Sequence, residues 1–156
     1  MKPIFKLAMA AALGLAFAPS GASAQKVTLN VITAGDQNMV DYVNNFLGPR
    51  FEKLNPGVKV RAVGTGPGDA GSQKIYEKLS AQQKAGAAAW DVDVAVVHQR
   101  GAGTMVKESL LAAYRNDVAA GKLVSRDTAK NALGANVDGY VIPMFHSQIA
   151  FAYNPA

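Results

Sequence analysis

Three short polar stretches hold most of the side chains in this chain that could bind a ligand. Each contains glycine, follows residues typical of a β-strand and precedes residues typical of a helix. They are Gly35–Asn38, Thr65–Asp69 and His98–Gly101. In a parallel sheet such turns meet at the carboxyl edge, where backbone N–H groups and polar side chains can face a ligand. The candidate ligand-binding residues here are Asp36, Gln37, Gly66, Gly68, Asp69, His98, Gln99 and Arg100.

The charges in these stretches leave the ligand open. Asp36 and Asp69 could meet a cation such as a polyamine, whereas the glycine turn and Arg100 could meet an anion. A single polar stretch of this kind is also explained as a simple connection between elements. Three of them at one edge favour a binding site, and we expect a small organic solute with a charged group.

The stretch Gly66–Gly71 matches the dinucleotide pattern G-x-G-x-x-G, but its context differs. It follows the second predicted strand, and the acidic residue about 20 positions on, Asp91, comes before the next strand. No Lys-Ser or Lys-Thr pair follows, so the stretch is not a P-loop either. It predicts a tight turn that offers N–H groups to an anion or a hydroxyl group, with no nucleotide cofactor.

Catalytic chemistry finds little support in the residue types. His98 and His146 are both candidate ligand contacts, with a bystander role equally open for each. They lie far apart in sequence with no acid at ligand spacing, so they do not form a metal site. The chain has no cysteine, and none of its serines lies in a G-x-S-x-G turn. We therefore expect a protein that is not an enzyme and that needs no cofactor.

The elements that must position these residues alternate along the chain. The predicted strands are 27–33, 58–63, 92–97, 140–144 and 149–153. The predicted helices are 39–54, 72–85 and 104–114, with a short helix capped by Ser125. Gly48-Pro49 is expected to kink or split the first helix. The order predicts an α/β fold with a mainly parallel sheet and helices on both faces, in three layers.

Apolar spacing gives a prediction of the core. The first helix places apolar residues at three- and four-residue intervals, and we expect this face to be buried. These residues are Val40, Val43, Phe46, Leu47, Phe51 and Leu54. The uninterrupted apolar run Val94–Val97 is typical of a strand buried on both faces. Asp91 and Asp93 beside it are expected to have structural roles.

Residues 1–24 have the pattern of a secretory signal peptide. Two lysines precede an apolar run from Leu7 to Ala18, and Ala22–Ala24 supplies the small residues of a cleavage site. The run is shorter than the about 20 residues that a membrane span needs. We predict cleavage between Ala24 and Gln25, a periplasmic location, and no stable membrane insertion after the signal is removed.

Composition excludes several partners. The formal net charge of the chain is +5, and the lysines and arginines of the chain do not cluster. Neither nucleic acid nor an anionic membrane is therefore an expected partner. The absence of cysteine means that stability rests on an ordinary apolar core. The chain after the signal is long enough for one domain with such a core.

Three stretches resemble the extracellular solute-binding proteins of ABC uptake transporters. Phe51–Val60 is similar to the family's F-E-K-x-N-P-G-(V/I)-x-V stretch, and Trp90–Val94 resembles its aromatic-Asp-Val strand. Asp138–Pro143 followed by Ala150–Pro155 resembles its D-G-x-x-x-x-P and Y-N segments. The three stretches occur in the family's order and span nearly the whole chain after the signal peptide.

The resemblance implies a two-lobed fold of the periplasmic-binding type II class. In that fold the lobes clamp a small solute and deliver it to a membrane permease. Residues 25–156 would then be the first lobe with the second lobe absent, either as a fragment, which we favour, or as an unusual single-lobe form. Half of such a pocket should bind its solute weakly, since a pocket normally covers most of its ligand.

Two other functions stay open on the sequence alone. An exported sensor or interaction module would use the same lobe to dock a membrane partner without carrying solute. An exported enzyme would use the glycine stretch or the two histidines, and the sequence favours it least.

Overall fold

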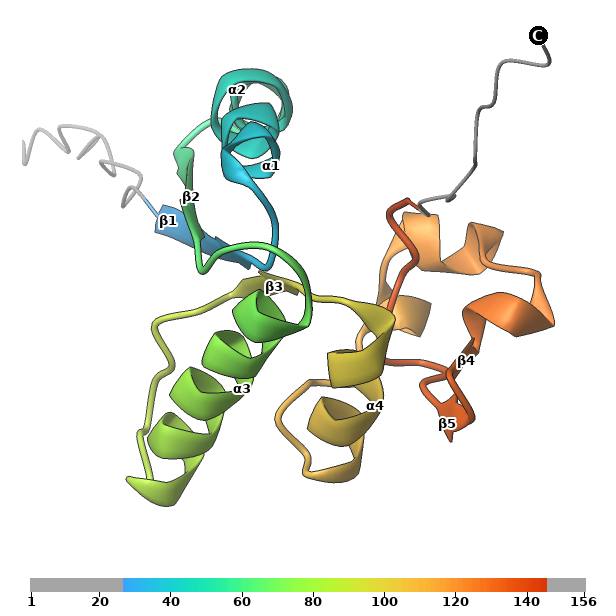
Figure 1. The fold of residues 1–156 in the computed structure, drawn as a ribbon. Helices are drawn as coiled ribbons and strands as arrows, with labels where there is room; N and C mark the ends of the chain where they lie inside the picture. Colours follow the sequence, from blue (N-terminus) through green and yellow to red (C-terminus); the bar gives the residue numbers. More distant parts are fainter. Residues whose placement is uncertain (1–26, 146–156) are drawn as a thin grey trace, which may run out of the picture.

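A computed structural model describes residues 27–145 of the chain (Figure 1). The strands are β1 Val27–Thr33, β2 Val58–Gly64, β3 Val94–Val96, β4 Asn131–Ala132 and β5 Ala135–Asn136. The α-helices are α1 Gln37–Tyr42, α2 Gly48–Leu54, α3 Gly68–Lys84 and α4 Gln99–Lys107. A π-helix, η1 Val43–Leu47, joins α1 to α2, and η2 Arg115–Asp117, η3 Ala119–Leu123 and η4 Asp127–Ala129 are 3₁₀ turns. None of the helices in the described range is long and apolar enough to cross a membrane. The signal peptide, His146 and the predicted strand 149–153 lie outside that range.

The main sheet has the order β2-β1-β3, and both of its pairings are parallel. β1 is rich in β-branched residues, which suit a pleated and largely buried surface. It lies in the middle, so its hydrogen-bonding groups are used on both sides. The prediction of an α/β fold with a parallel sheet is confirmed.

Helices pack on both sides of the central strand. Val31 and Ile32 are adjacent in β1 and therefore point to opposite faces. Ile32 packs with buried residues of α3 and α4, among them Ile75 and Met105. Val31 packs with Val43 on the other side. Figure 1 shows α1 and α2 on one side of the strands and α3 and α4 on the other.

The first predicted helix is continuous but contains a π turn directly before Pro49. Proline has no N–H to donate, so the regular α pattern cannot run through that position. The helix widens instead, and the Gly48 N–H donates to the Val43 carbonyl five residues earlier. Gly48-Pro49 was expected to kink or split the helix, and the structure has a single wider turn before it instead.

The prediction of one fully buried apolar face on this helix was wrong in part. Val43 is buried, with Val40 and Leu47 packed against the same cluster. In contrast, Phe46, Phe51 and Leu54 are 40%, 43% and 80% exposed. The helix covers the sheet with a narrow stripe, so side chains beyond that stripe face outward. Phe46 packs locally instead: its ring stacks on Tyr42 with 5.2 Å between centroids, and the Arg50 guanidinium lies 3.5 Å from its centre.

β3 is shorter than predicted and is not buried on both faces. Val94 is 41% exposed, because within residues 27–145 β3 pairs with β1 alone. Asp93 extends the pairing, since its N–H donates to the Asn30 carbonyl and its Oδ2 accepts the Asn30 N–H at 2.8 Å. Asp91 accepts hydrogen bonds from Lys78 and from a glutamine of α3. The structural roles predicted for both aspartates are confirmed.

The fourth helix begins five residues earlier than predicted. α4 starts at Gln99, directly after β3 and His98, and ends at Lys107. Gly101 and Gly103 lie within this helix, where they allow close packing. A Cβ on Gly103 would lie 2.5 Å from the Ala135 Cβ of the β4–β5 hairpin. Tertiary packing therefore overrides the low helix propensity of glycine here.

The segment after α4 differs most from the prediction. Residues 140–144 do not form a strand. The structure has instead a short antiparallel hairpin of β4 and β5, whose turn residues Leu133 and Gly134 both have positive φ. Ser125 caps no helix, because Arg126 occupies the N-cap position of η4 and no side chain bonds there. The hairpin packs on α4 through Ala102, Ala132 and Val137.

A buried arginine fastens this segment together. Arg115 is 4% exposed, and its Nη2 forms an ion pair with Asp138. Its backbone N–H donates to the Gly139 carbonyl at 2.9 Å. Residues near 115 are thereby tied to residues near 138. The guanidinium Nη1 has no hydrogen-bond partner within residues 27–145, so Asp138 carries most of the compensation for its burial.

We therefore expect Asp138→Asn to destabilise the chain. Removing the carboxylate charge leaves a buried guanidinium without an ionised partner, and we expect a loss of about 1–3 kcal/mol in the free energy of unfolding. Urea denaturation measures it. The control is Asp127→Asn, which breaks an exposed pair with Lys130 at 3.4 Å and should change stability by less than about 0.5 kcal/mol. Equal losses in the two variants would contradict the role of Asp138.

Candidate functional site

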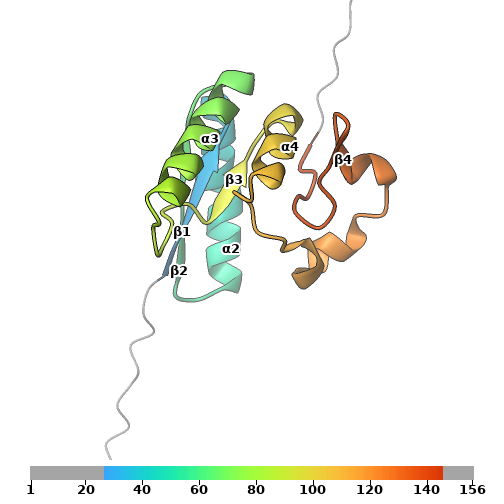
Figure 2. The same ribbon diagram turned by 90° about the horizontal axis from the view of Figure 1, so that it is seen from below.

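The three strand ends meet in register at one edge. Thr33, the last residue of β1, pairs with Gly64 on one side and Val96 on the other. Two backbone hydrogen bonds continue the strand pairing into the first loop residues. The Ala34 N–H donates to the Val96 carbonyl at 2.8 Å, and the Thr65 N–H donates to the Thr33 carbonyl at 2.9 Å. Figure 2 shows the three strands side by side. The three strand-to-helix turns therefore start at the same edge.

The eight candidate residues that the structure describes all lie in these turns or in the first turn of the helices that follow. Asp36 and His98 occupy the N-cap positions of α1 and α4. The others lie in the glycine turn or open a helix: Gln37, Gly66, Gly68, Asp69, Gln99 and Arg100. His146, the ninth candidate, falls outside the described residues.

Asp69 and Arg100 bind each other. Arg100 Nε lies 2.9 Å from Asp69 Oδ2, which joins the start of α4 to the start of α3. From the sequence, Asp69 could meet a cation of the ligand and Arg100 could meet an anion. The structure places them as partners instead, with 58% of the Asp69 side chain and 74% of the Arg100 side chain exposed. An ion pair this exposed is weak, so either group remains available to a stronger partner.

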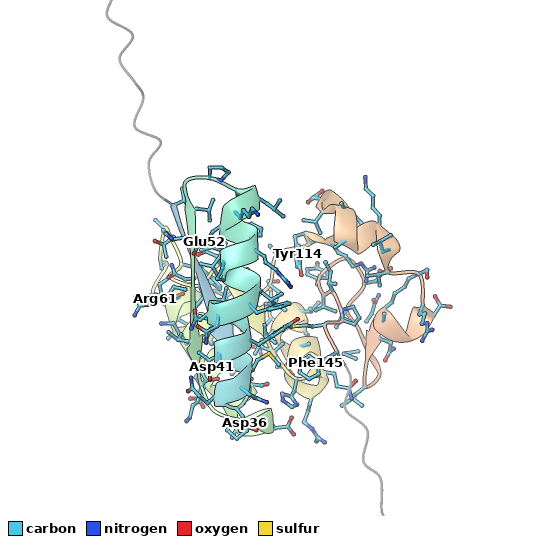
Figure 3. The ribbon with its side chains drawn as sticks, turned by 90° about the horizontal axis from the view of Figure 1, so that it is seen from above. Asp36, Asp41, Glu52, Arg61, Tyr114 and Phe145 are labelled. Atoms are coloured by element: carbon cyan, nitrogen blue, oxygen red, sulfur yellow. The ribbon has the colours of Figure 1, made fainter. Side chains whose placement is uncertain are left out.

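The α1 turn presents a carboxylate that the helix does not use. Asp36 accepts the Met39 N–H with its backbone carbonyl, and its side chain makes no capping hydrogen bond. Gln37 donates to Asp41 one turn further along the helix at 2.9 Å. Figure 3 shows Asp36 at the start of α1 with Asp41 beyond it. The Asp36 carboxylate is thus exposed at the edge, while the Gln37 amide is engaged.

The glycine stretch forms the tight turn that the sequence predicts. Gly66 and Gly68 have φ values of 99° and 64°, which side chains other than glycine rarely adopt. A Cβ on Gly71 would lie 1.9 Å from the Gly66 carbonyl oxygen. The Thr65 hydroxyl lies within hydrogen-bond distance of the carbonyl oxygens of Thr33 and Gly71. The turn is held against the end of β1, with the N-terminus of α3 open at the edge.

Three hydroxyl residues of the site were missed by the sequence reasoning. Ser72 is 2% exposed, and its Oγ accepts the His98 N–H at 3.0 Å, which fixes the start of α4 on α3. Thr65 holds the glycine turn. The Thr33 hydroxyl is buried with no hydrogen-bond partner in the range 27–145. Ser72 was not among the candidates from the sequence, although a small polar residue in the first turns of a helix is also a packing signal.

A pocket of about 210 Å³ opens between the first turns of α3 and α4. It is lined by Asp69, Ser72, Gln73, Tyr76, Arg100, Gly101 and Thr104. Its lining combines a carboxylate, a guanidinium, hydroxyl groups and one aromatic ring. Pockets that enclose a small molecule usually measure about 300–1,000 Å³. This pocket therefore provides only part of the wall that a bound solute needs.

A second hollow of about 260 Å³ lies on the α3 side of the sheet, lined by Asn30, Val31, Ile32, Arg61, Val63, Lys78, Asp91 and Val92. The sequence did not predict it. Lys78 Nζ lies 2.6 Å from Asp91 Oδ2, and this hydrogen bond, with a second one from Gln82, holds the pKa of the Asp91 carboxyl below its ordinary value. These contacts fasten the segment before β3 to α3.

Comparison with known proteins identifies one family. A family model described as bacterial extracellular solute-binding protein matches residues 36–156. The match begins within the first strand-to-helix turn, at Asp36, and covers the other two turns in full. Searches of curated proteins and of solved structures found no match. In residues 27–145, no three His, Cys, Asp or Glu side chains are grouped so that they could hold a metal ion.

We expect Gly71→Ala to disrupt the glycine turn. The new methyl group would meet the Gly66 carbonyl oxygen, and either the turn or α3 must shift, at a cost of about 1–3 kcal/mol in the free energy of unfolding. Urea denaturation measures this loss. Ala70→Ser, an exposed change in the same helical turn, should leave stability nearly unchanged. A Gly71→Ala protein as stable as the Ala70→Ser control would refute the close contact.

The lowered pKa of Asp91 predicts a dependence of stability on acid. The ordinary pKa is 3.8, and the folded value lies below it, so the stabilisation is complete above about pH 4 and is lost as pH falls through the folded pKa. Urea midpoints of the wild type and of Asp91→Asn should differ more at about pH 6 than at about pH 2.5. A difference that stays constant over this range would contradict the ion pair with Lys78.

Proposed function

The chain belongs to the family of bacterial extracellular solute-binding proteins, and from that premise we propose that it captures a small solute at the carboxyl edge of the β2-β1-β3 sheet. Proteins of this family bind solutes and are typically not enzymes. The observation that carries the proposal is the register at Thr33. It brings three polar turns, from three separate parts of the chain, to one edge.

The side chains at this edge support a charged organic solute. Within residues 27–145 Arg100 pairs with Asp69, and a carboxylate or phosphate of the solute can replace the Asp69 carboxylate in this exposed pair. The open N-termini of α3 and α4 lie beside it and favour negative charge. The exposed Asp36 carboxylate would meet a positively charged or hydroxyl-bearing part of the same molecule. We therefore propose an anionic group at Arg100 as the main contact.

Both the size of the pocket and the hydroxyl groups beneath the edge are consistent with a partial binding wall. The pocket of about 210 Å³ is small for a whole solute. The buried Thr33 hydroxyl, which has no hydrogen-bond partner among the described residues, adds a polar group below the edge. We propose that the described residues form the first lobe of a two-lobed clamp of the periplasmic-binding type II class, in three layers, and that a facing lobe supplies the other wall.

The family also bears on location and partner. We propose that residues 1–24 direct export, that the protein works in the periplasm, and that it delivers its solute to the permease of an ABC importer. An extracellular solute-binding protein requires such a location to meet its solute before uptake. The match to this family favours transport over the sensor and enzyme alternatives.

Solute binding at Arg100 can be tested by thermal shift. Probes of four classes serve: citrate, inorganic phosphate, spermidine and maltose. An anionic probe at about ten times its Kd should stabilise the chain by about 1.4 kcal/mol and raise the Tm accordingly. Arg100→Ala should weaken that binding about tenfold or more, because a hydrogen-bonded charge contact is lost.

The matched control is Lys107→Ala, which removes the same charge at the other end of α4. It should bind the anionic probe like the wild type. If no class of probe raised the Tm, the proposed solute binding would be refuted. If binding occurred but Arg100→Ala and Lys107→Ala behaved alike, the assignment of Arg100 would be wrong.

A further inference from the structure

Side chains of the first helix occupy the outer edge of β2. β2 pairs with β1 on one side, and within residues 27–145 no strand lies on its other side. Asn44 Oδ1 accepts the Ala62 N–H at 2.8 Å, and Asn44 Nδ2 donates to the Ala62 carbonyl at 3.1 Å. Glu52 Oε1 accepts the Val60 N–H at 2.9 Å. Three backbone groups that point away from the sheet are therefore satisfied by two side chains.

We propose that Asn44 and Glu52 close a strand-accepting edge, and that without them β2 pairs with β2 of a second copy of this chain. The carboxamide of Asn44 offers the donor and the acceptor that a peptide group of a neighbouring strand would offer. An edge strand with free N–H and C=O groups is a template for another chain. The two side chains take the positions that such a strand would need.

The local structure of the helix is suited to this closure. Asn44 lies in the π-helix η1, and this π-helix ends directly before Gly48 and Pro49. A Cβ on Gly48 would lie 3.2 Å from the Val60 Cβ, so glycine lets the helix approach β2 closely enough for short side chains to reach its backbone. The wider turn and the close approach together bring Asn44 to Ala62.

Glu52 is held in place from the strand itself. Its Oε2 lies 2.7 Å from Lys59 Nζ, while its other oxygen takes the Val60 N–H. Figure 3 shows Glu52 and Arg61 on the same flank of the helix, where β2 runs. The ion pair with Lys59 orients the Glu52 carboxylate, so the hydrogen bond from the Val60 N–H is held from the strand as well as from the helix.

A second copy of this chain is the partner because the outward-facing backbone groups of β2 lie on alternate residues, Val60 and Ala62, so the same edge can pair with itself. Apolar and basic side chains alternate over Val58–Ala62, and the seven-residue strand is long enough to pair with itself around a two-fold axis. Such pairing would bring Lys59 and Arg61 of both copies to one face, where like charges repel. Glu52 partly neutralises Lys59. Both basic side chains are exposed, so this repulsion is weak and the blocked backbone groups are the main barrier to association.

The experiment compares Asn44→Ala with Asn45→Ala. Asn45 is the exposed neighbour of Asn44 in the same π-helix, so the two variants make the same chemical change. Sedimentation velocity over a hundredfold range of concentration measures association, and hydrogen exchange measures protection of residues 58–64. Asn44→Ala should form a dimer or larger species at concentrations where the wild type and Asn45→Ala do not. In the dilute, unassociated Asn44→Ala variant, the Ala62 amide should exchange at least about ten times faster than in the wild type.

In the associated form of Asn44→Ala, residues 58–64 should regain protection. Sedimentation of Asn44→Ala like Asn45→Ala would overturn the proposal, even if the Ala62 amide exchanged faster. Association without protection of β2 would overturn it too, because another surface would then be responsible. Should Asn44→Ala lose its far-UV circular dichroism, Glu52→Ala carries the same test at Val60 against Lys53→Ala as control. Neither pair of variants touches the residues proposed to bind solute.

Discussion

Parallel hydrogen bonding of β1 to two neighbours at once is the constraint on which the other features depend. Thr33 pairs with both Gly64 and Val96, so all three following turns must leave the sheet at the same place. A parallel sheet also requires each chain crossover to return over a face, which puts α1 and α2 on one side and α3 on the other. Val31 and Ile32 then anchor two separate apolar clusters from a single strand.

Close approach of backbone segments is the second recurring feature. Gly48 lets the first helix approach Val60, and Gly71 lets α3 lie against the glycine turn. Each approach allows short polar side chains to reach backbone groups: Asn44 reaches Ala62, and Thr65 reaches Thr33. Such hydrogen bonds matter most where they satisfy buried backbone groups, since an unsatisfied one costs about 1–3 kcal/mol. The turns at the binding edge and the closed edge of β2 are thus built in the same way.

The candidate site combines firmly held backbone with loosely held charges. The glycine turn and the start of α4 are fixed by the hydroxyl groups of Thr65 and Ser72, whereas the charged side chains of the site remain exposed. This division suits a binding protein of the solute-binding family, because a rigid frame keeps the contact points in place while the charged groups exchange partners. The shallow pocket between α3 and α4 agrees with a frame that covers only one side of its ligand.

The sequence by itself determined the parallel α/β class, the three strands of the main sheet and the edge at which the polar turns gather. These features follow from local periodicity, since the spacing of apolar residues along the chain differs between strands and helices. Only the tertiary structure decided that Asp69 and Arg100 bind each other, that Phe46 and Phe51 face outward, and that α4 begins within a glycine-containing stretch. Each of these depends on which distant segment lies alongside, and spacing along the chain carries no information about that.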